Sequence, residues 1–180
     1  PSRGLGDVYK RQVLYGNPTL RVKSAEVDKV DDDLRKTLDE MVELMRSANG
    51  VGLAANQVDI PKRFFVLEVE GNVKKVVNPE IIESGEEMVE FEEGCLSIPG
   101  VYKKVTRPEK IKVKYLDENG EEKVEELTEM WSRAFQHELD HLEGILFTDR
   151  ISVLNKRLVA KKLEILKKDY NKGKIYREDI

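Results

Sequence analysis

The sequence QHELDH at residues 136–141 determines how the rest of the chain is interpreted. His137 and His141 are four positions apart, so on an α-helix their side chains project from one face, about one turn from each other. Two imidazoles in that arrangement can bind one metal ion, and the Glu138 carboxylate can reach a water at the ion without coordinating it. The segment therefore predicts a metal-binding helix that also carries a general base.

This helix is predicted to run from Thr128 to about Leu142. Thr128 suits the N-cap position, good helix formers follow it, and Gly144 is a stop signal. A surface helix can carry two histidines by chance, but His137 and His141 are the only histidines in the chain. We therefore favour joint metal binding over coincidence.

Cys95, the only cysteine in the chain, is the predicted third ligand. The alternative is that it is a small buried hydrophobe, as a single reduced cysteine often is. However, Cys95 follows Gly94 between two predicted strands, where a backbone can approach an ion closely and present a thiolate. Two imidazoles, one thiolate and a water leave an open position, as catalytic sites do. An ion held in this way can activate a water and polarise a carbonyl, which indicates hydrolytic chemistry.

Helix and strand patterns flank the predicted site. Apolar residues recur on one helical face between Asp28 and Ser47, and Asn49 and Gly50 end that helix. A third helix is predicted with its apolar residues mainly on one side and lysines elsewhere, at Leu154, Leu158, Leu163, Ile165, Leu166 and Tyr170. Short strands are expected at 64–69, 73–77, 88–92, 101–106, 110–116 and 121–127.

These elements predict an α+β fold. We expect mostly antiparallel, short-stranded sheets packed around a central metal-binding helix, with an N-terminal helix and a C-terminal helix. A chain of 180 residues can bury one core but not comfortably two, so residues 13–171 are expected to form one catalytic domain. Residues 1–12 (PSRGLGDVYKRQ) read as a non-native or disordered leader, and residues 172–180 as a polar tail.

Composition narrows the class of protein. No apolar run approaches the roughly 20 residues of a membrane-spanning helix, and a lone cysteine cannot form an internal disulfide. We therefore expect a cytoplasmic protein that does not bind membranes. Residues 151–180 carry nine Lys or Arg against four Asp or Glu, a net charge of +5 in a chain of net charge −4. This basic end is either a contact for an anionic assembly or a solvated helix face, and nothing predicts sequence-specific nucleic-acid binding.

Three segments in one order closely resemble the signature motifs of peptide deformylases. They are GVGLAANQ at 50–57, EGCLSIPG at 93–100 and QHELDH at 136–141. The likeness extends through VLYGNPTLR, QVDIPKRFFVLE, RPEKIKVKY and HLEGILFTDRI, and so covers nearly all of residues 13 to about 155. The resemblance is to the bacterial type, and it implies a metallo-amidohydrolase that removes the formyl group from the N-terminal formylmethionine of newly synthesised polypeptides and releases formate.

The resemblance also implies residue roles that agree with the spacing. Cys95, His137 and His141 would hold one divalent metal ion, and Glu138 would act first as the general base and then as the acid that protonates the leaving amine. Cysteine with two histidines suits zinc, ferrous iron, cobalt or nickel on ligand type alone. The family favours ferrous iron in the working enzyme, with zinc, nickel or cobalt able to replace it in a purified sample.

Further family positions concern the oxyanion and the substrate. The Gln57 side chain and the Leu96 backbone N–H would donate hydrogen bonds to the developing oxyanion. Without the resemblance, Gln57 could simply cap a turn. The residues that match family positions near the peptide or its methionine pocket are Val51, Gly52, Glu93, Met130, Arg133 and Ala134.

Two positions depart from the commonest family pattern. Glu129 stands where glycine is usual, and Trp131 replaces a smaller residue, which we interpret as packing rather than ligand contact. Asp140 is expected either to orient a histidine, to pair with Arg107, or simply to be solvated. Similar bacterial enzymes suggest that the basic C-terminal helix contacts the ribosome.

Two rival functions make different predictions. A zinc endopeptidase shares the H-E-x-x-H pattern but would more usually take histidine or glutamate as its third ligand, and it would cleave internal peptide bonds. A catalytically silent metal-binding or ribosome-associated module would bind metal without releasing formate from a formylated peptide.

Overall fold

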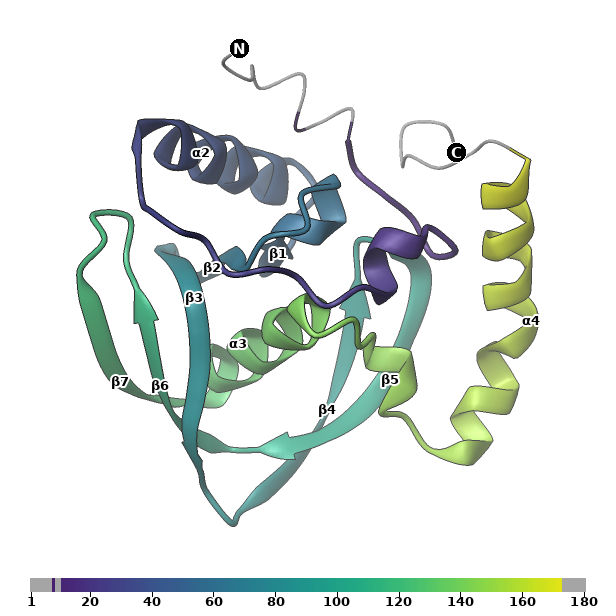
Figure 1. Cartoon of the computed structure of the whole chain (residues 1–180). Coiled ribbons are helices and arrows are strands. Elements are labelled where there is room, and N and C mark those ends of the chain that lie inside the picture. Colours follow the sequence, from purple (N-terminus) through teal and green to yellow (C-terminus); the bar gives the residue numbers. More distant parts are fainter. Residues whose placement is uncertain (1–7, 9–10, 173–180) are drawn as a thin grey trace.

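The computed structural model describes residue 8 and residues 11–172, which form an α+β fold (Figure 1). The predicted fold class is therefore confirmed. In chain order the elements are η1 (Pro18–Arg21), α2 (Asp32–Ser47), β1 (Gly52–Ala54), η2 (Ala55–Val58), β2 (Phe64–Val69), β3 (Asn72–Ser84), β4 (Met88–Cys95), β5 (Ile98–Pro108), β6 (Lys110–Leu116), β7 (Glu122–Thr128), α3 (Glu129–Leu142), η3 (Phe147–Asp149) and α4 (Val153–Asn171).

The strands form two sheets, and α3 contacts both. Five strands pair in the order β1-β2-β3-β6-β7, while β4 and β5 form a separate two-stranded sheet. Every pairing between these strands is antiparallel, as predicted. In Figure 1, α3 runs through the middle of the molecule with strands of both sheets around it. Strands of both sheets therefore surround the predicted central helix, and residues at the ends of these strands can reach it.

Local chemistry explains where α2 begins and ends. Asp31 is its N-cap and accepts a hydrogen bond from the Leu34 backbone N–H at 2.9 Å. Leu38, Met41 and Met45 are buried against the five-stranded sheet. Asn49, with φ 55°, adopts the left-handed conformation that ends the helix.

The core next to α3, the predicted metal-binding helix, contains packed aromatic rings. Phe135 of α3 meets Phe65 of β2 edge-on, with ring centroids 5.1 Å apart and an interplanar angle of 85°. Both rings are fully buried, and β6 adds Ile111 and Val113 to the same cluster. This packing fixes α3 against the five-stranded sheet.

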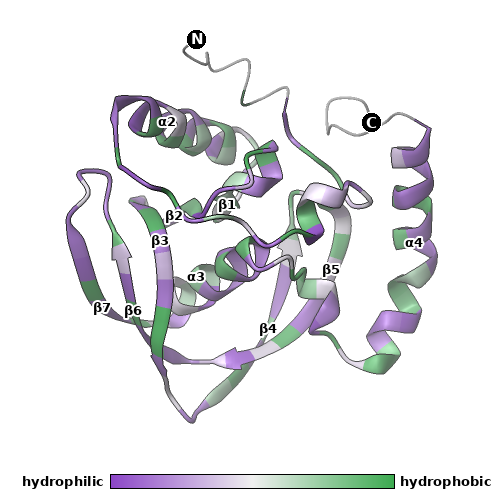
Figure 2. Ribbon diagram, in the orientation of Figure 1, coloured by the Kyte–Doolittle hydropathy of each residue, from purple (hydrophilic) through white to green (hydrophobic). Residues whose placement is uncertain are grey.

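The prediction that the apolar residues of α4 lie mainly on one side of the helix is wrong. Val159 and Leu166 are buried and Leu163 is partly buried against β5, but Leu154 and Leu158 are 66% and 63% exposed. Ile165 is 50% exposed. The helix lies at the edge of the molecule beside β5, and Figure 2 shows hydrophobic residues along it. A helix that contacts the domain along a narrow stripe cannot bury apolar residues spread around its circumference.

Few of the terminal residues belong to the described part of the chain. Val8 is fully buried in the cluster that includes α2, and Gln12 is 6% exposed. Residues 1–7, 9–10 and 173–180 lie outside the described residues, so the predicted leader and tail boundaries stay predictions. Among the helices of the described residues, none has the length and apolar character required to span a membrane.

Candidate metal centre

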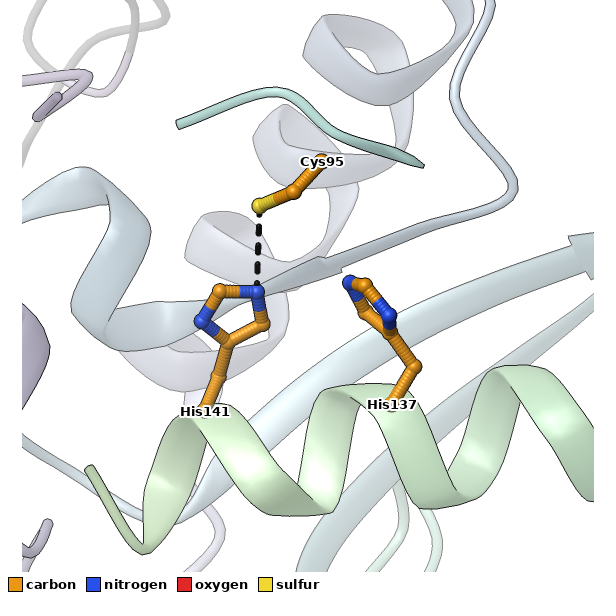
Figure 3. Close-up of side chains that lie close together, drawn as sticks. All are labelled: Cys95, His137 and His141. Atoms are coloured by element: carbon orange, nitrogen blue, oxygen red, sulfur yellow. Dashed lines mark hydrogen bonds between the residues drawn. The ribbon is translucent and has the colours of Figure 1, made fainter. Parts of the chain in front are cut away.

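Three potential ligands from distant parts of the chain converge on one point (Figure 3). Cys95 is the last residue of β4, while His137 and His141 lie one turn apart on α3. One ligand atom from each, the Cys95 sulfur and a ring nitrogen of each histidine, lie within 4.8 Å of one another. The Cys95 Sγ and His141 Nε2 are 3.3 Å apart, and the two imidazole centroids are separated by 5.2 Å.

These donors fit a divalent transition-metal ion. With metal–sulfur and metal–nitrogen bonds of about 2.3 and 2.1 Å, a tetrahedral ion places sulfur and nitrogen roughly 3.5 Å apart. The observed separation of Cys95 Sγ and His141 Nε2 is close to that value. Burial holds the pKa of His141 well below its usual value, so this imidazole is neutral, which is the form that binds metal.

Glu93 holds His137 in place. Its Oε1 lies 2.8 Å from His137 Nδ1, which leaves the Nε2 of that ring available for an ion. Arg107 donates two hydrogen bonds to Glu93, at 2.6 and 2.9 Å, and Arg133 donates one at 2.6 Å. Although burial raises the pKa of Glu93, the hydrogen bonds with Arg107 and His137 hold it well below its usual range. Glu93 is therefore an ionised carboxylate that orients the imidazole.

The pKa of His137 itself reflects opposing effects. Burial lowers it, but the Glu138 carboxylate and the hydrogen bonds with Cys95 and Glu93 outweigh burial and hold it well above the usual value. Without an ion, His137 is thus protonated, and an ion that binds there displaces a proton.

Asp140 extends the ion-pair network away from the ligands. It accepts from Arg107 at 3.0 Å and from Arg150 at 2.6 and 2.8 Å. The predicted pairing with Arg107 is confirmed, whereas Arg150 was not anticipated because it lies after η3, ten residues further along the chain. The continuous path runs from Arg150 through Asp140, Arg107 and Glu93 to His137.

Glu138 is the buried carboxyl group beside the ligands. Burial raises its pKa to about 7, and its Oε2 lies 3.9 Å from His137 Nε2. A Cβ added at Gly52 would meet Oε2 at 2.5 Å and Cγ at 2.9 Å, so the carboxyl lies directly against the glycine backbone. Glycine at position 52 therefore makes room for Glu138, and a carboxyl with a pKa near 7 can both accept and donate a proton at neutral pH.

Gln57 approaches the same point from η2. Its Oε1 accepts from the Ala54 backbone N–H at 2.9 Å, which orients the side-chain amide. Its Nε2 lies 3.4 Å from Cys95 Sγ and 3.1 Å from Ser97 Oγ. Gln57 thus presents an N–H donor beside the ligand sulfur, and Ser97 is a contact that sequence reasoning missed.

A pocket of about 320 Å³ opens onto these groups. Leu96, Gln57, Cys95, His137 and Glu138 line it. It is also lined by all six residues predicted to lie near the substrate, namely Val51, Gly52, Glu93, Met130, Arg133 and Ala134. Tyr102, which stacks over Gly94 and lines the wall, had no signal in the sequence that pointed to it.

At the two positions that depart from the family pattern, the structure shows why glycine is usual at 129 and what the tryptophan at 131 contacts. Glu129 has φ 53°, a left-handed conformation that favours glycine. Trp131 packs partly buried against the core, with the Lys74 ammonium 5.0 Å from its ring centroid, and it is not among the pocket residues. Packing is therefore the role of Trp131 that the structure supports.

Comparisons with known proteins agree on one family. Residues 10–157 match the sequence profile of the family described as Polypeptide deformylase. The peptide deformylase of Fusobacterium nucleatum is 50% identical over 167 residues, which are 90% of this chain and 94% of that protein. Among solved structures, the crystal structure of peptide deformylase from Thermotoga maritima superposes with a TM-score of 0.78, and the two sequences are 47% identical. The match covers 79% of this chain and 97% of that one. The crystal structure of the peptide deformylase of Thermus thermophilus has 40% sequence identity and a TM-score of 0.83, and the match covers 88% of this chain and 98% of that one.

Proposed function

The chain belongs to the polypeptide deformylase family, and from that membership we propose how its residues perform the reaction. Members are metal-dependent hydrolases that remove the N-formyl group from nascent polypeptides, and this is the function of the chain. Our proposal assigns Cys95, His137 and His141 as metal ligands and Glu138 as the acid–base residue. The supporting observation is the convergence of the three ligand atoms within 4.8 Å, next to a buried carboxyl group.

Ferrous iron is the proposed working metal. When bound, the ion lowers the pKa of a water molecule and polarises the formyl carbonyl. A single thiolate with two imidazoles accepts iron, zinc, nickel or cobalt, so a purified sample can carry any of them. Metal analysis of protein purified without oxygen, paired with activity per bound metal, identifies the working ion.

Glu138 transfers the proton in this scheme. As water attacks the formyl carbon, the carboxylate accepts a proton from that water. It then donates the proton to the amine nitrogen as the carbon–nitrogen bond breaks, which yields formate and a free amine. Burial of this carboxyl raises its pKa in the ion-free protein to about 7, and a group that accepts and returns a proton works best when its pKa is near the working pH.

Gln57 and Leu96 are the proposed oxyanion donors. The Ala54 N–H holds the Gln57 amide with its Nε2 beside Cys95, from where this N–H donor would reach the oxyanion as it forms. Leu96 follows Cys95 directly and lines the same pocket, which supports the proposal that its backbone N–H is the second donor. Donors fixed where charge develops stabilise the transition state more than the ground state.

The proposed substrate is a peptide that begins with formylmethionine. Val51, Gly52, Met130 and Ala134 give the pocket small and apolar surfaces that suit an unbranched thioether side chain. Glu93 and Arg133 also face this wall, but their charged groups bond to each other at 2.6 Å. We assign these two residues to shaping the pocket from behind.

The basic helix α4 supports a further proposal, contact with the ribosome, and the cytoplasmic location that we propose follows from such a contact. Lys156, Arg157, Lys161, Lys167 and Lys168 are all exposed on α4. Exposed cations next to exposed leucines form a surface suited to an anionic assembly. Cosedimentation with ribosomes at two salt concentrations tests the contact, which should weaken as salt rises.

The decisive experiment measures formate release from formyl-Met-Ala-Ser. Glu138→Gln should retain the metal and lower turnover by roughly 10²- to 10⁴-fold, because the acid–base group is lost. Glu126→Gln, an exposed glutamate on β7, is the matched control and should react normally. Near-normal deformylation by Glu138→Gln would refute the assignment, and casein cleavage by the unaltered protein would favour an endopeptidase instead.

A further inference from the structure

A second cavity, of about 180 Å³, lies on another face of α3. It shares no lining residue with the pocket at the metal ligands. Its walls come from α3, from β3, from the adjacent ends of β4 and β5, and from Arg150 beyond η3. It is therefore a separate feature that the deformylation reaction does not use.

One wall of this cavity is apolar. Ile81 of β3 and Leu139 of α3 are partly buried at the edge of the core, and Pro108 closes the end of β5. Met88, at the start of β4, is 52% exposed. These side chains can bury a few carbon atoms of a ligand, and the volume corresponds to about six water molecules. The enclosed part of the cavity therefore suits a small ligand.

Charged side chains also line the cavity. Arg107, Arg150 and Asp140 line it, two cations against one anion. Arg107 is 4% exposed and already bonds to Glu93 and Asp140, so its charge is largely compensated. The Arg150 side chain is 44% exposed, and within the described part of the chain it bonds to Asp140.

Arg150 has donors available for a ligand. A guanidinium carries five N–H bonds, and the two hydrogen bonds to Asp140 use the Nε and one N–H of Nη2. The bidentate pairing also fixes the plane of the guanidinium, so the remaining N–H groups are held in position before a ligand arrives. Thr106 lines the same cavity, and its hydroxyl is a further donor within the site.

We propose that this cavity binds a short aliphatic monocarboxylate. Its carboxylate would accept hydrogen bonds from Arg150, and its branched hydrocarbon end would lie against Ile81, Met88 and Leu139. The N–H groups that Arg150 does not use can bind one carboxylate, whereas a doubly charged phosphate would place its second charge beside the Asp140 carboxylate without compensation. A ligand there would also contact the network that ends at His137, since Asp140 and Arg107 belong to both.

The test uses the zinc-loaded protein, which is diamagnetic, labelled with ¹³C at its methionine methyl groups. Met88 lines the second cavity and Met130 lines the metal pocket, so each reports on one site. On titration with 3-methylbutanoate, the Met88 signal should shift and saturate while the Met130 signal stays unchanged. Arg150→Gln should weaken binding at least tenfold. Arg157→Gln, which removes an exposed arginine of α4, is the matched control and should leave binding unaltered.

Two ligand controls separate charge from shape. The uncharged 3-methylbutanamide should bind at least tenfold more weakly, because it lacks the anion. Formate should also bind more weakly, because it has no carbon chain to bury against the apolar wall. A saturating shift of Met130 alone, equal binding of the amide, or equal binding by Arg150→Gln would overturn the proposal, and these ligand comparisons apply even if the variant folds poorly.

Discussion

Helices α3 and α4 distribute polar and apolar residues in opposite ways. The polar residues that α3 buries are Ser132, Arg133, Gln136, Glu138, Asp140 and His141. In contrast, α4 leaves Val153, Leu154, Leu158 and Ile165 at least half exposed. Both helices depart from the usual rule that apolar residues point inward. The polar residues that α3 buries support the chemistry of the site, whereas the apolar residues that α4 exposes form part of the molecular surface.

The two departures have different energetic consequences. Buried charges cost free energy unless partners compensate them, and α3 meets this requirement through Glu93, Arg107 and Arg150. Glu138 alone keeps a buried carboxyl oxygen, Oε1, without a hydrogen-bond partner among the described residues of α3. Exposed apolar side chains on α4 cost little, because much of any protein surface is apolar. Stability should therefore depend strongly on the polar residues around α3 and weakly on the outer residues of α4.

The largest expected change in the free energy of unfolding comes from removing the Arg107 guanidinium, which lies in the middle of the ion-pair network around α3. Arg107→Met removes the cation that bonds to both Glu93 and Asp140, and it should lower the free energy of unfolding by about 3 to 5 kcal/mol. Urea unfolding measures the change. Lys114→Met, which breaks an exposed pair with Glu122 at 3.3 Å, is the control and should cost less than about 1 kcal/mol. Equal losses in the two variants would show that burial of the network adds nothing.

The second effect concerns the uncompensated Glu138 and depends on pH. Its pKa in the folded protein is about 7, above the ordinary 4.5. The protonated carboxyl is therefore the form that the fold stabilises, and ionisation of Glu138 lowers the free energy of unfolding. This stability is complete below about pH 4.5 and is lost as pH rises through 7. In metal-free protein, the stability gain from Glu138→Gln should therefore grow by about 3 kcal/mol between pH 4.5 and pH 8.

Unfolding of metal-free wild type and Glu138→Gln at a series of pH values provides this measurement. The comparison uses the change with pH, so any constant effect of the buried amide cancels. A difference between the two proteins that does not vary with pH would mean that Glu138 is ionised normally in the fold.

The third effect contrasts the two sides of α4. Leu166→Ala should lower the free energy of unfolding by about 2 kcal/mol, because the side chain is 8% exposed and packs against β5 and its neighbours. Leu158→Gln should change it by less than about 0.5 kcal/mol, because that side chain is 63% exposed. Thermal or urea unfolding distinguishes the two. A large loss in Leu158→Gln would mean that this leucine is covered in solution.

Most elements could be predicted from the sequence because their signals are local. The strands β2 and β6 have the predicted bounds, α2 (Asp32–Ser47) lies within the segment predicted as a helix, and α3 begins directly after the predicted cap Thr128. In contrast, β1 (Gly52–Ala54) was not predicted, because three residues in a glycine-rich segment carry no periodicity. The partners of α4 also could not be predicted, since periodicity identifies a helix but not how much of its circumference a neighbour covers.

The site was partly predictable for a similar reason. Spacing and scarcity pointed to His137, His141 and Cys95, and the structure brings these three together. The residues that support them could not be found in this way, because Arg150 and Ser97 reach the site only through tertiary packing. Their residue types are common, and although both lie in segments that resemble the family, nothing in those segments shows which groups their side chains meet. Ligands are therefore easier to predict than the groups that orient them.

The smallest effect lies at the entry to α3. Glu129 has φ 53° and is exposed, and a left-handed conformation costs a non-glycine residue about 1 to 2 kcal/mol. Glycine relieves that strain but loses more entropy on folding, so Glu129→Gly should stabilise the fold by about 1 kcal/mol. Lys123→Gly on β7, where φ is not positive, should instead destabilise it by about 0.5 to 1 kcal/mol. Urea unfolding of both variants tests this, and a loss of stability in Glu129→Gly would show that the glutamate side chain contributes more at the start of α3 than its backbone strain costs.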